Sequence, residues 1–180
     1  DLQTVFQFLD LADMLHFKCL PLPDIELHGS GMNVDVENNL ITQAAIALQA
    51  ATGCTLGASI QVDKQIPVGG GVGGGSSDAA TTLLALNQLW NINCTTDPLI
   101  KLGLQLGADV PLFIFGHNAF AEGIGEKLTK IKLPSAWYLV LCPTVNVPTA
   151  EIFSSKELTR NTIPIKIPPF SIWQGHNDLE

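Results

Sequence analysis

The sequence feature that most restricts the fold is a glycine run at residues 69–75, in which six of the seven residues are glycine. Glycine loses more conformational entropy on folding than any other residue, so an ordinary turn rarely contains this many. A backbone with almost no side chains can wrap closely around a ligand. A flexible linker or a crowded packing turn is the alternative explanation, so the segments on either side of the run matter.

A predicted strand leads into the glycine run and a predicted helix follows it. Residues 58–63 alternate apolar and polar side chains, which indicates a strand with one exposed face. Apolar residues recur at spacings of four, three and four from Ala79 to Trp90, which predicts an amphipathic helix over residues 76–90. The free amides at the start of that helix, Ser76 to Ala79, and the positive end of its dipole would face the glycine run. The order of elements therefore predicts a site for an anion, and a chain of phosphates fits best.

Two well-known glycine motifs give little help with this run. A P-loop has a lysine directly after its last glycine, whereas Ser76 follows Gly75 here. The pattern GxGxxG is satisfied, but so many glycines satisfy almost any glycine pattern. We therefore predict that the run is not a P-loop, and its match to GxGxxG is only weak evidence for a dinucleotide-binding fold.

The rest of the chain mixes helix and strand patterns without internal repeats. Asn39 is a predicted N-cap of a helix that Gly53 ends, and Asp97 is a predicted N-cap of a helix that Gly107 ends. Residues 137–142 form an apolar run that predicts a buried strand. The pattern as a whole predicts a two-layer domain of the α+β or α/β class.

Composition excludes several classes of protein. With 46% hydrophobic and 14% charged residues, the 180-residue chain can bury a sizeable core, and no apolar run is long enough to cross a membrane. A net charge of −8 with only nine basic residues argues against a nucleic-acid partner. Neither the cysteines nor the histidines have metal-ligand spacing, so we predict no metal site built from them and expect the cysteines to be reduced core thiols of a cytosolic protein. The cysteines are Cys19, Cys54, Cys94 and Cys142.

Residues 67–81, with the sequence PVGGGVGGGSSDAAT, closely resemble the phosphate-binding motif of the GHMP kinases. Their longer Gly-Gly-Gly-Ser-Ser form is typical of the branch that phosphorylates 4-diphosphocytidyl-2-C-methyl-D-erythritol, in which Leu or Met usually stands at the position of Val72. Three further segments resemble motifs of this branch in order and spacing. They are residues 106–113, 123–126 and 143–153.

The resemblance implies an α+β fold, with the two-layer N-terminal domain of the GHMP kinases over residues 1–160. Residues 161–180 would then be a linker and the start of a C-terminal α/β domain. The chain opens within a strand-like stretch without Met and stops without a closing element, so we expect it to be part of a longer protein.

The resemblance also implies roles for individual residues. Asp109 would take or orient the proton of the attacking hydroxyl group, although from its position it is equally well explained as the N-cap of a short helix. Thr149 and Phe153 would contact the cytidine end of the substrate; without the resemblance, an N-cap threonine and a core phenylalanine explain them. The residues implied to bind ATP are Pro67, Gly69, Gly70, Gly71, Val72, Gly73, Gly74, Gly75, Ser76, Ser77 and Asn39, the last of which is also explained as a helix N-cap.

The activity implied is transfer of the γ-phosphate of ATP, accompanied by Mg²⁺, to the 2-hydroxyl of 4-diphosphocytidyl-2-C-methyl-D-erythritol. This reaction belongs to the non-mevalonate route to isoprenoid precursors, in the bacterial cytoplasm or the plastid stroma. The family pairs its aspartate with a lysine in an Ala-Lys-Ile/Leu-Asn motif, which Lys64 does not match, and we expect that motif to precede Asp1. The alternatives are another GHMP small-molecule kinase, of the homoserine or mevalonate type, and a nucleotide-binding module without kinase activity.

Overall fold

The computed structural model describes residues 2–30, 36–123, 125–142, 154–156, 158–159, 162–163 and 176–178. The chain divides into a compact unit of residues 1–132 and a second unit of residues 133–180. All helices and strands named below belong to the first unit. In chain order they are β1 (Leu2–Phe6), β2 (Met14–Leu20), β3 (Ile25–Ser30), the 3-10 helix η1 (Val36–Asn38), α1 (Leu40–Thr52), β4 (Gly57–Asp63), α2 (Gly74–Leu89), α3 (Thr96–Leu106), α4 (Val110–Phe115), β5 (Ala119–Gly123) and β6 (Lys127–Lys130).

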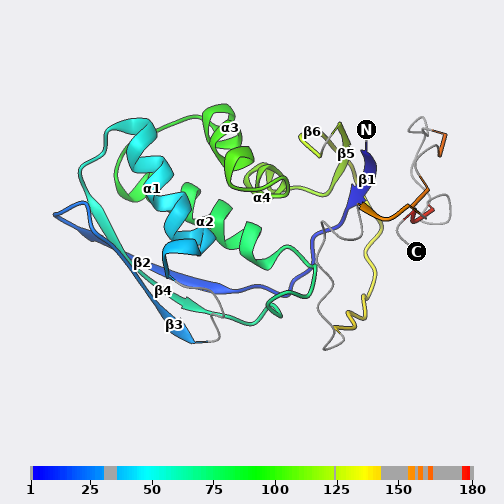
Figure 1. Cartoon of the computed structure of the whole chain (residues 1–180), viewed down its shortest axis with the longest axis horizontal. Coiled ribbons are helices and arrows are strands. Elements are labelled where there is room, and N and C mark those ends of the chain that lie inside the picture. The colour runs from blue at the N-terminus through cyan, green and yellow to red at the C-terminus, as the bar shows by residue number, and fades with distance from the viewer. Residues whose placement is uncertain are drawn as a thin grey trace. The chain divides into compact units, whose positions relative to one another are not determined.

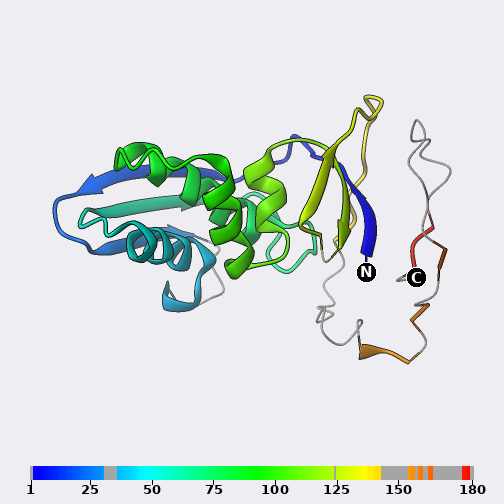
Figure 2. The ribbon, with the colours of Figure 1, turned by 90° about the horizontal axis from the view of Figure 1, so that it is seen from above.

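Two three-stranded sheets organise this unit (Figure 1). In the first, β4 lies in the middle, antiparallel to β2 and parallel to β3. In the second, β5 lies in the middle and pairs antiparallel with both β1 and β6. Helices α1 and α2 cover the same face of the β2-β4-β3 sheet, as Figures 1 and 2 show, so this part of the unit has two layers.

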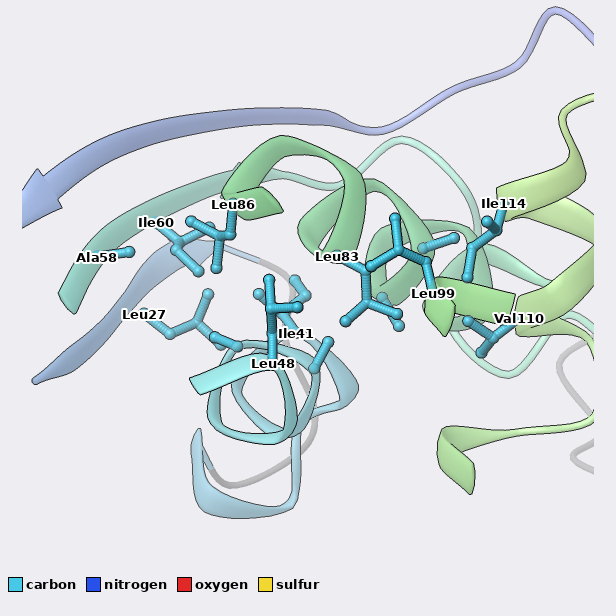
Figure 3. Close-up of a cluster of buried hydrophobic side chains, with 14 of the residues drawn as sticks. Leu27, Ile41, Leu48, Ala58, Ile60, Leu83, Leu86, Leu99, Val110 and Ile114 are labelled. Carbon is cyan, nitrogen blue, oxygen red and sulfur yellow. The ribbon is translucent and has the colours of Figure 1, made fainter. Parts of the chain in front are cut away.

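The core lies between the β2-β4-β3 sheet and its helices. The alternating side chains Ala58, Ile60 and Val62 of β4 are fully buried, which confirms the strand period predicted for residues 58–63. They share one apolar cluster with side chains from both helices, among them Leu48 and Leu83 (Figure 3). Burial of these apolar side chains holds β4, which precedes the glycine run, against α2, which follows it.

The predicted helix limits are confirmed for α1 and partly wrong for the other two helices. Asn39 Oδ1 accepts a hydrogen bond from the Ile41 amide at 2.9 Å, and Gly53 ends α1 in the left-handed conformation. Helix α2 begins at Gly74, two residues before the predicted start. The N-cap of α3 is Thr95, so Asp97 lies in the first turn, where its charge still favours the helix dipole.

The buried strand predicted at residues 137–142 is wrong. Trp137 is 101% exposed and Leu139 is 85% exposed, and neither lies in a strand. An apolar run forms a strand only beside a partner that takes up its backbone hydrogen bonds, and no described strand pairs with this segment. Cys142 is exposed as well, so the prediction of a core thiol is wrong for this residue. The other three cysteines are half-buried and pack against the core.

None of the helices in the described part of the chain is long and apolar enough to span a lipid bilayer.

Replacing Leu83 by alanine tests the core. Leu83 is fully buried, so Leu83→Ala is expected to lower the free energy of unfolding by about 2–5 kcal/mol through lost burial and a new cavity. Leu84→Ala on the same helix is the matched control, because Leu84 is 41% exposed and its loss is expected to cost less than about 1 kcal/mol. Urea denaturation measures both, and equal losses would contradict this packing of α2.

Candidate anion-binding site at the glycine loop

The glycine loop, residues 67–73, adopts a conformation that depends on its glycines. The Gly70 amide donates to the Pro67 carbonyl at 3.2 Å, which closes the first turn. Gly69, Gly71 and Gly73 then have φ angles of +76°, +70° and +74°. Side chains disfavour this left-handed region, so three alternate positions of the loop favour glycine on backbone grounds. Backbone turns that alternate in this way form concavities of N–H groups that bind anions.

The N-terminus of α2 adds unpaired donors to the end of this loop. The first intrahelical hydrogen bond runs from the Ser77 amide to the Gly73 carbonyl at 2.9 Å. By helix geometry the four amides from Gly73 to Ser76 have no acceptor inside the helix. The prediction that placed the free amides at Ser76 to Ala79 is therefore wrong by about one turn. The reason is that Gly73 is the N-cap of α2, so the helix begins before the predicted start. The positive end of the α2 dipole coincides with these four amides.

Some of these glycines are required by packing and others are not. A β-carbon on Gly73 would lie 2.9 Å from the ring of Phe113, and one on Gly74 would lie 2.9 Å from Cγ2 of Ile66. Close packing of the chain against Phe113 and Ile66 leaves no room for side chains here, and this alone explains the two glycines. A β-carbon on Gly71 would meet no described atom within 4 Å. The backbone of Gly71 thus borders open space, as a loop that surrounds a ligand requires.

Helix α1 begins beside the start of α2. A β-carbon on Gly75 would lie 3.6 Å from Cδ1 of Leu40, the first residue of α1. Leu40, the neighbour of Asn39 in the chain, thus packs on the first turn of α2, and the side chain of Asn39 caps α1, as the alternative explanation of this residue predicted. Contact of Asn39 with a nucleotide stays a prediction.

Asp109 lies on a turn that approaches the same helix start. A β-carbon on Gly107 would lie 3.9 Å from Ser76 Oγ, and one on Gly125 would lie 3.9 Å from the Ala108 carbonyl. Asp109 is exposed and occupies the N-cap position of α4, a helix described in full, but its side chain makes no capping hydrogen bond there. The explanation of Asp109 as a structural cap is thereby weakened. Thr149 and Phe153 lie outside the described residues.

The structure also reveals a buried ion cluster that sequence reasoning missed. Lys64 Nζ lies 2.5 Å from Asp13 Oδ2 and 2.8 Å from Asp78 Oδ2. The side chains of Lys64, Asp13 and Asp78 are 11%, 1% and 5% exposed. One signal was available, since Asp78 is the only charged residue in the sequence of α2. Charged side chains are almost never fully buried without a partner, so an Asp on the buried side of this helix requires one.

Burial and pairing act in opposite directions on these three groups. Burial raises the pKa of Asp78 to about 6, although the hydrogen bond from Lys64 works against this shift. Burial alone would raise the pKa of Asp13, but hydrogen bonds from Lys64 and from the amides of Ile66 and Gln65 outweigh it and lower the pKa. Burial alone would lower the pKa of Lys64, but its two carboxylate partners outweigh it and raise the pKa. Asp78 is therefore the member of the cluster that titrates nearest neutral pH.

No group of three or more His, Cys, Asp or Glu side chains within the described ranges lies close enough together to hold a metal ion.

The residues around this site are similar to a known protein family. Residues 39–117 match the family described as GHMP kinases N terminal domain. These residues are therefore similar to the N-terminal domain of the GHMP kinases. This match covers α1, β4, the glycine loop, α2, α3 and α4, and it confirms the predicted α+β fold of this family.

Relatives at high identity match almost the whole chain. The chain is 61% identical over 179 residues to 4-diphosphocytidyl-2-C-methyl-D-erythritol kinase of Nitrosospira multiformis, covering 99% of the chain and 61% of that protein. It is 56% identical over 180 residues to the kinase of the same name from Nitrosomonas europaea, covering 99% of the chain and 65% of that protein. The chain thus spans somewhat less than two thirds of the length of these relatives.

Two solved structures share the fold. The crystal structure of a 4-(cytidine 5'-diphospho)-2C-methyl-D-erythritol kinase matches with a TM-score of 0.71 and 34% identity, over 92% of this chain and 58% of that one. Homoserine kinase from Cytophaga hutchinsonii matches with a TM-score of 0.63 and 16% identity, over 85% of this chain and 53% of that one. At that identity the second match shows the fold alone.

The raised pKa of Asp78 predicts a pH dependence of stability. A carboxyl group whose pKa is higher in the folded state than in the unfolded state stabilises the fold when it is protonated. For Asp78 this contribution is complete at pH values below the unfolded-state pKa near 4, and it is lost as the pH rises through the folded-state pKa of about 6. The free energy of unfolding of the wild type, relative to that of Asp78→Asn, is therefore expected to increase as pH falls from about 7 to about 4. A ¹³C NMR titration of the Asp78 carboxyl group provides the direct measurement, and a midpoint near 4 would contradict the burial argument.

Proposed function

We propose that the intact protein is an ATP-dependent kinase for the 2-hydroxyl group of 4-diphosphocytidyl-2-C-methyl-D-erythritol, a step in the synthesis of isoprenoid precursors. The observation that carries this proposal is the glycine loop, which ends in four helix-start amides beside the turn that bears Asp109. The names of relatives that are 61% and 56% identical support the choice of substrate. Those relatives are bacterial, so we also propose the bacterial cytoplasm as the location.

In this proposal the glycine loop holds the phosphates of ATP. Anions bind well at helix N-termini, because unpaired amides and the helix dipole act together. The loop also leaves the backbone of Gly71 beside open space, so a phosphate chain can approach it closely. The proposed ATP contacts are those implied by the sequence, namely residues 67, 69–77 and 39.

Magnesium fits the proposed site only as part of the nucleotide complex. Mg²⁺ keeps several of its waters and is usually held by one or two carboxylates together with substrate phosphates. The described residues offer no ready-made group of three acidic, histidine or cysteine ligands. We therefore propose that Mg²⁺ arrives with ATP and that the phosphates are its main ligands.

Asp109 is proposed to act on the attacking hydroxyl group. Phosphoryl transfer depends mainly on positioning and on stabilising charge, with a carboxylate near the nucleophile to take or orient its proton. Asp109 is exposed, and its turn passes the Ser76 hydroxyl at the proposed phosphate site. In the family this aspartate is paired with a lysine of an Ala-Lys-Ile/Leu-Asn motif, which Lys64 does not match.

The proposals for the cytidine end and for the domain limits rest on the sequence. Thr149 and Phe153 are proposed to contact the cytidine, with Phe153 stacking on the base at a gain of about 1–3 kcal/mol. The GHMP domain is proposed to extend through residue 160, with residues 161–180 leading into a second α/β domain. Photocrosslinking from position 153 to a cytidine nucleotide would test the first of these assignments.

The alternative activities are separated by one assay. A homoserine kinase shares the fold at 16% identity, which does not select a substrate. Coupled measurement of ADP release by the intact protein is expected to show turnover with the cytidine substrate and much less with homoserine or mevalonate. Turnover with homoserine alone would overturn the substrate proposal. ATP binding without turnover on any of these substrates would indicate a binding module.

Asp109→Asn is expected to lower kcat of the intact protein by roughly two to four powers of ten, the scale for loss of a general base, while leaving ATP affinity nearly unchanged. Asp97→Asn is the matched control, since Asp97 is exposed on the first turn of α3, and its activity is expected to equal that of the wild type. Full activity of Asp109→Asn in the ADP-release assay would remove Asp109 from the mechanism.

Gly73→Ala is expected to lower ATP affinity by about tenfold or more, which corresponds to at least ~1.4 kcal/mol. The added methyl group is strained at φ +74° and meets the ring of Phe113, so the loop must shift. Gly53→Ala is the control, because Gly53 has nearly the same φ of +68° but no described atom within 4 Å of its β-carbon position. Calorimetric titration with ATP is expected to leave Gly53→Ala unaffected. Equal affinity of both variants would exclude this end of the loop from the site.

A further inference from the structure

The ion cluster of Lys64, Asp13 and Asp78 lies at the base of the glycine loop. Lys64 follows β4 directly, and Asp78 is the fifth residue of α2. Lys64 and Asp78 are 14 positions apart along the chain and the segment between them includes the whole loop, yet their charged atoms lie 2.8 Å apart. Lys64 therefore joins the two ends of the loop across its base.

Asp13 fixes the chain where it enters the loop. One of its carboxylate oxygens, Oδ1, accepts hydrogen bonds from the amides of Gln65 at 2.6 Å and Ile66 at 2.8 Å. The other oxygen, Oδ2, pairs with Lys64. Asp13 itself lies just before β2, the neighbour of β4 in the sheet. The entry to the loop is thus held to the sheet through both oxygens of one buried carboxylate.

The chain that leaves the loop packs against the same cluster. A β-carbon on Gly74 would lie 3.5 Å from Lys64 Nζ and 2.9 Å from Cγ2 of Ile66. The first residue of α2 therefore rests on the lysine ammonium group and on the residue that Asp13 holds. A displacement of Lys64 would therefore be expected to move the start of α2 and its amides.

The surroundings of Lys64 exclude a direct role as a phosphate-binding lysine. Its side chain is only 11% exposed, and two of its three ammonium donors are directed at carboxylates. A contact with a phosphate would require Lys64 to leave both partners in a buried environment, where unpaired charges are costly. Any effect of Lys64 on a bound anion would therefore pass through the loop.

Stability alone is a poor reason for this cluster. Replacing a buried group of ion pairs by apolar side chains of similar volume is often neutral or stabilising, because burial removes the charges from water. The cluster provides directed bonds, which apolar contacts do not. Directed bonds fix the separation between the end of β4 and the start of α2.

We propose that Lys64, held between Asp13 and Asp78, is a positioning residue that keeps the glycine loop in the shape that binds nucleotide phosphates. This inference rests on the proposed function, because it assumes that the loop binds those phosphates.

The first test compares ATP with adenosine in the intact protein. Lys64→Met is expected to weaken ATP binding by about tenfold to a hundredfold, the range for a lost charge-assisted hydrogen bond, while adenosine affinity changes by less than about twofold. Lys101→Met on the exposed surface of α3 is the matched control, and its ATP affinity is expected to equal that of the wild type. Equal losses for ATP and adenosine, or no loss for either, would overturn the proposal.

The second test removes the charges together, since Lys64→Met leaves two carboxylates buried without their cation. The triple variant Asp13→Asn, Lys64→Met, Asp78→Asn is expected to regain much of the thermal stability lost in Lys64→Met. Its ATP affinity is expected to stay low, because methionine cannot join the two ends of the loop. Recovery of wild-type ATP affinity together with stability would overturn the positioning role.

The same measurements separate this inference from the proposed function. If the wild-type protein fails to bind ATP, the proposed function fails and the inference fails with it. If the wild type binds ATP and Lys64→Met binds it equally well, only the positioning role of Lys64 is wrong.

Discussion

The attachment of α2 to β4 is the constraint on which the rest of the structure depends. Just beyond α2, the indole Nε1 of Trp90 donates to the carbonyl of Gly57 at the start of β4, at 3.0 Å. At the opposite end, Lys64 beyond β4 pairs with Asp78 in α2. The apolar side chains of both elements share one core between these two links (Figure 3). The strand and the helix are therefore fixed to each other at both ends.

This fixed frame explains how so flexible a sequence can form a defined loop. Ordering six glycines is costly in entropy, and a glycine-rich segment without fixed ends behaves as a flexible linker. Here the ends of the loop are set by the buried cluster around Lys64 and by Phe113 and Ile66, which pack against Gly73 and Gly74. The amides at the start of α2 are then directed before any ligand arrives. Such preorganisation lowers the cost of binding an anion.

Much of the secondary structure around the loop could be predicted, because its signals come from residues close together in the sequence. The period of β4 and the capping of α1 by Asn39 and Gly53 are such signals. The start of α2 was predicted too late because glycine permits the left-handed conformation of Gly73 without requiring it. Thr95 and Asp97 are both good N-cap residues, so the local sequence does not choose between them, and the structure has Thr95 at this position. Residues 137–142 are apolar enough for a strand, but a strand also needs a neighbour.

By itself, the sequence determined the order of strand, glycine run and helix, because hydrophobic period and helix capping are local properties of the chain. This order was enough to predict an anion site. Only the tertiary structure decided which distant groups meet. Asp13 lies 51 residues from Lys64 in the sequence, so no local pattern connects them. The approach of the Asp109 turn to Ser76 likewise results from the packing of α4 near α2. Buried charges find partners wherever packing brings elements together, so these contacts depend on the whole fold.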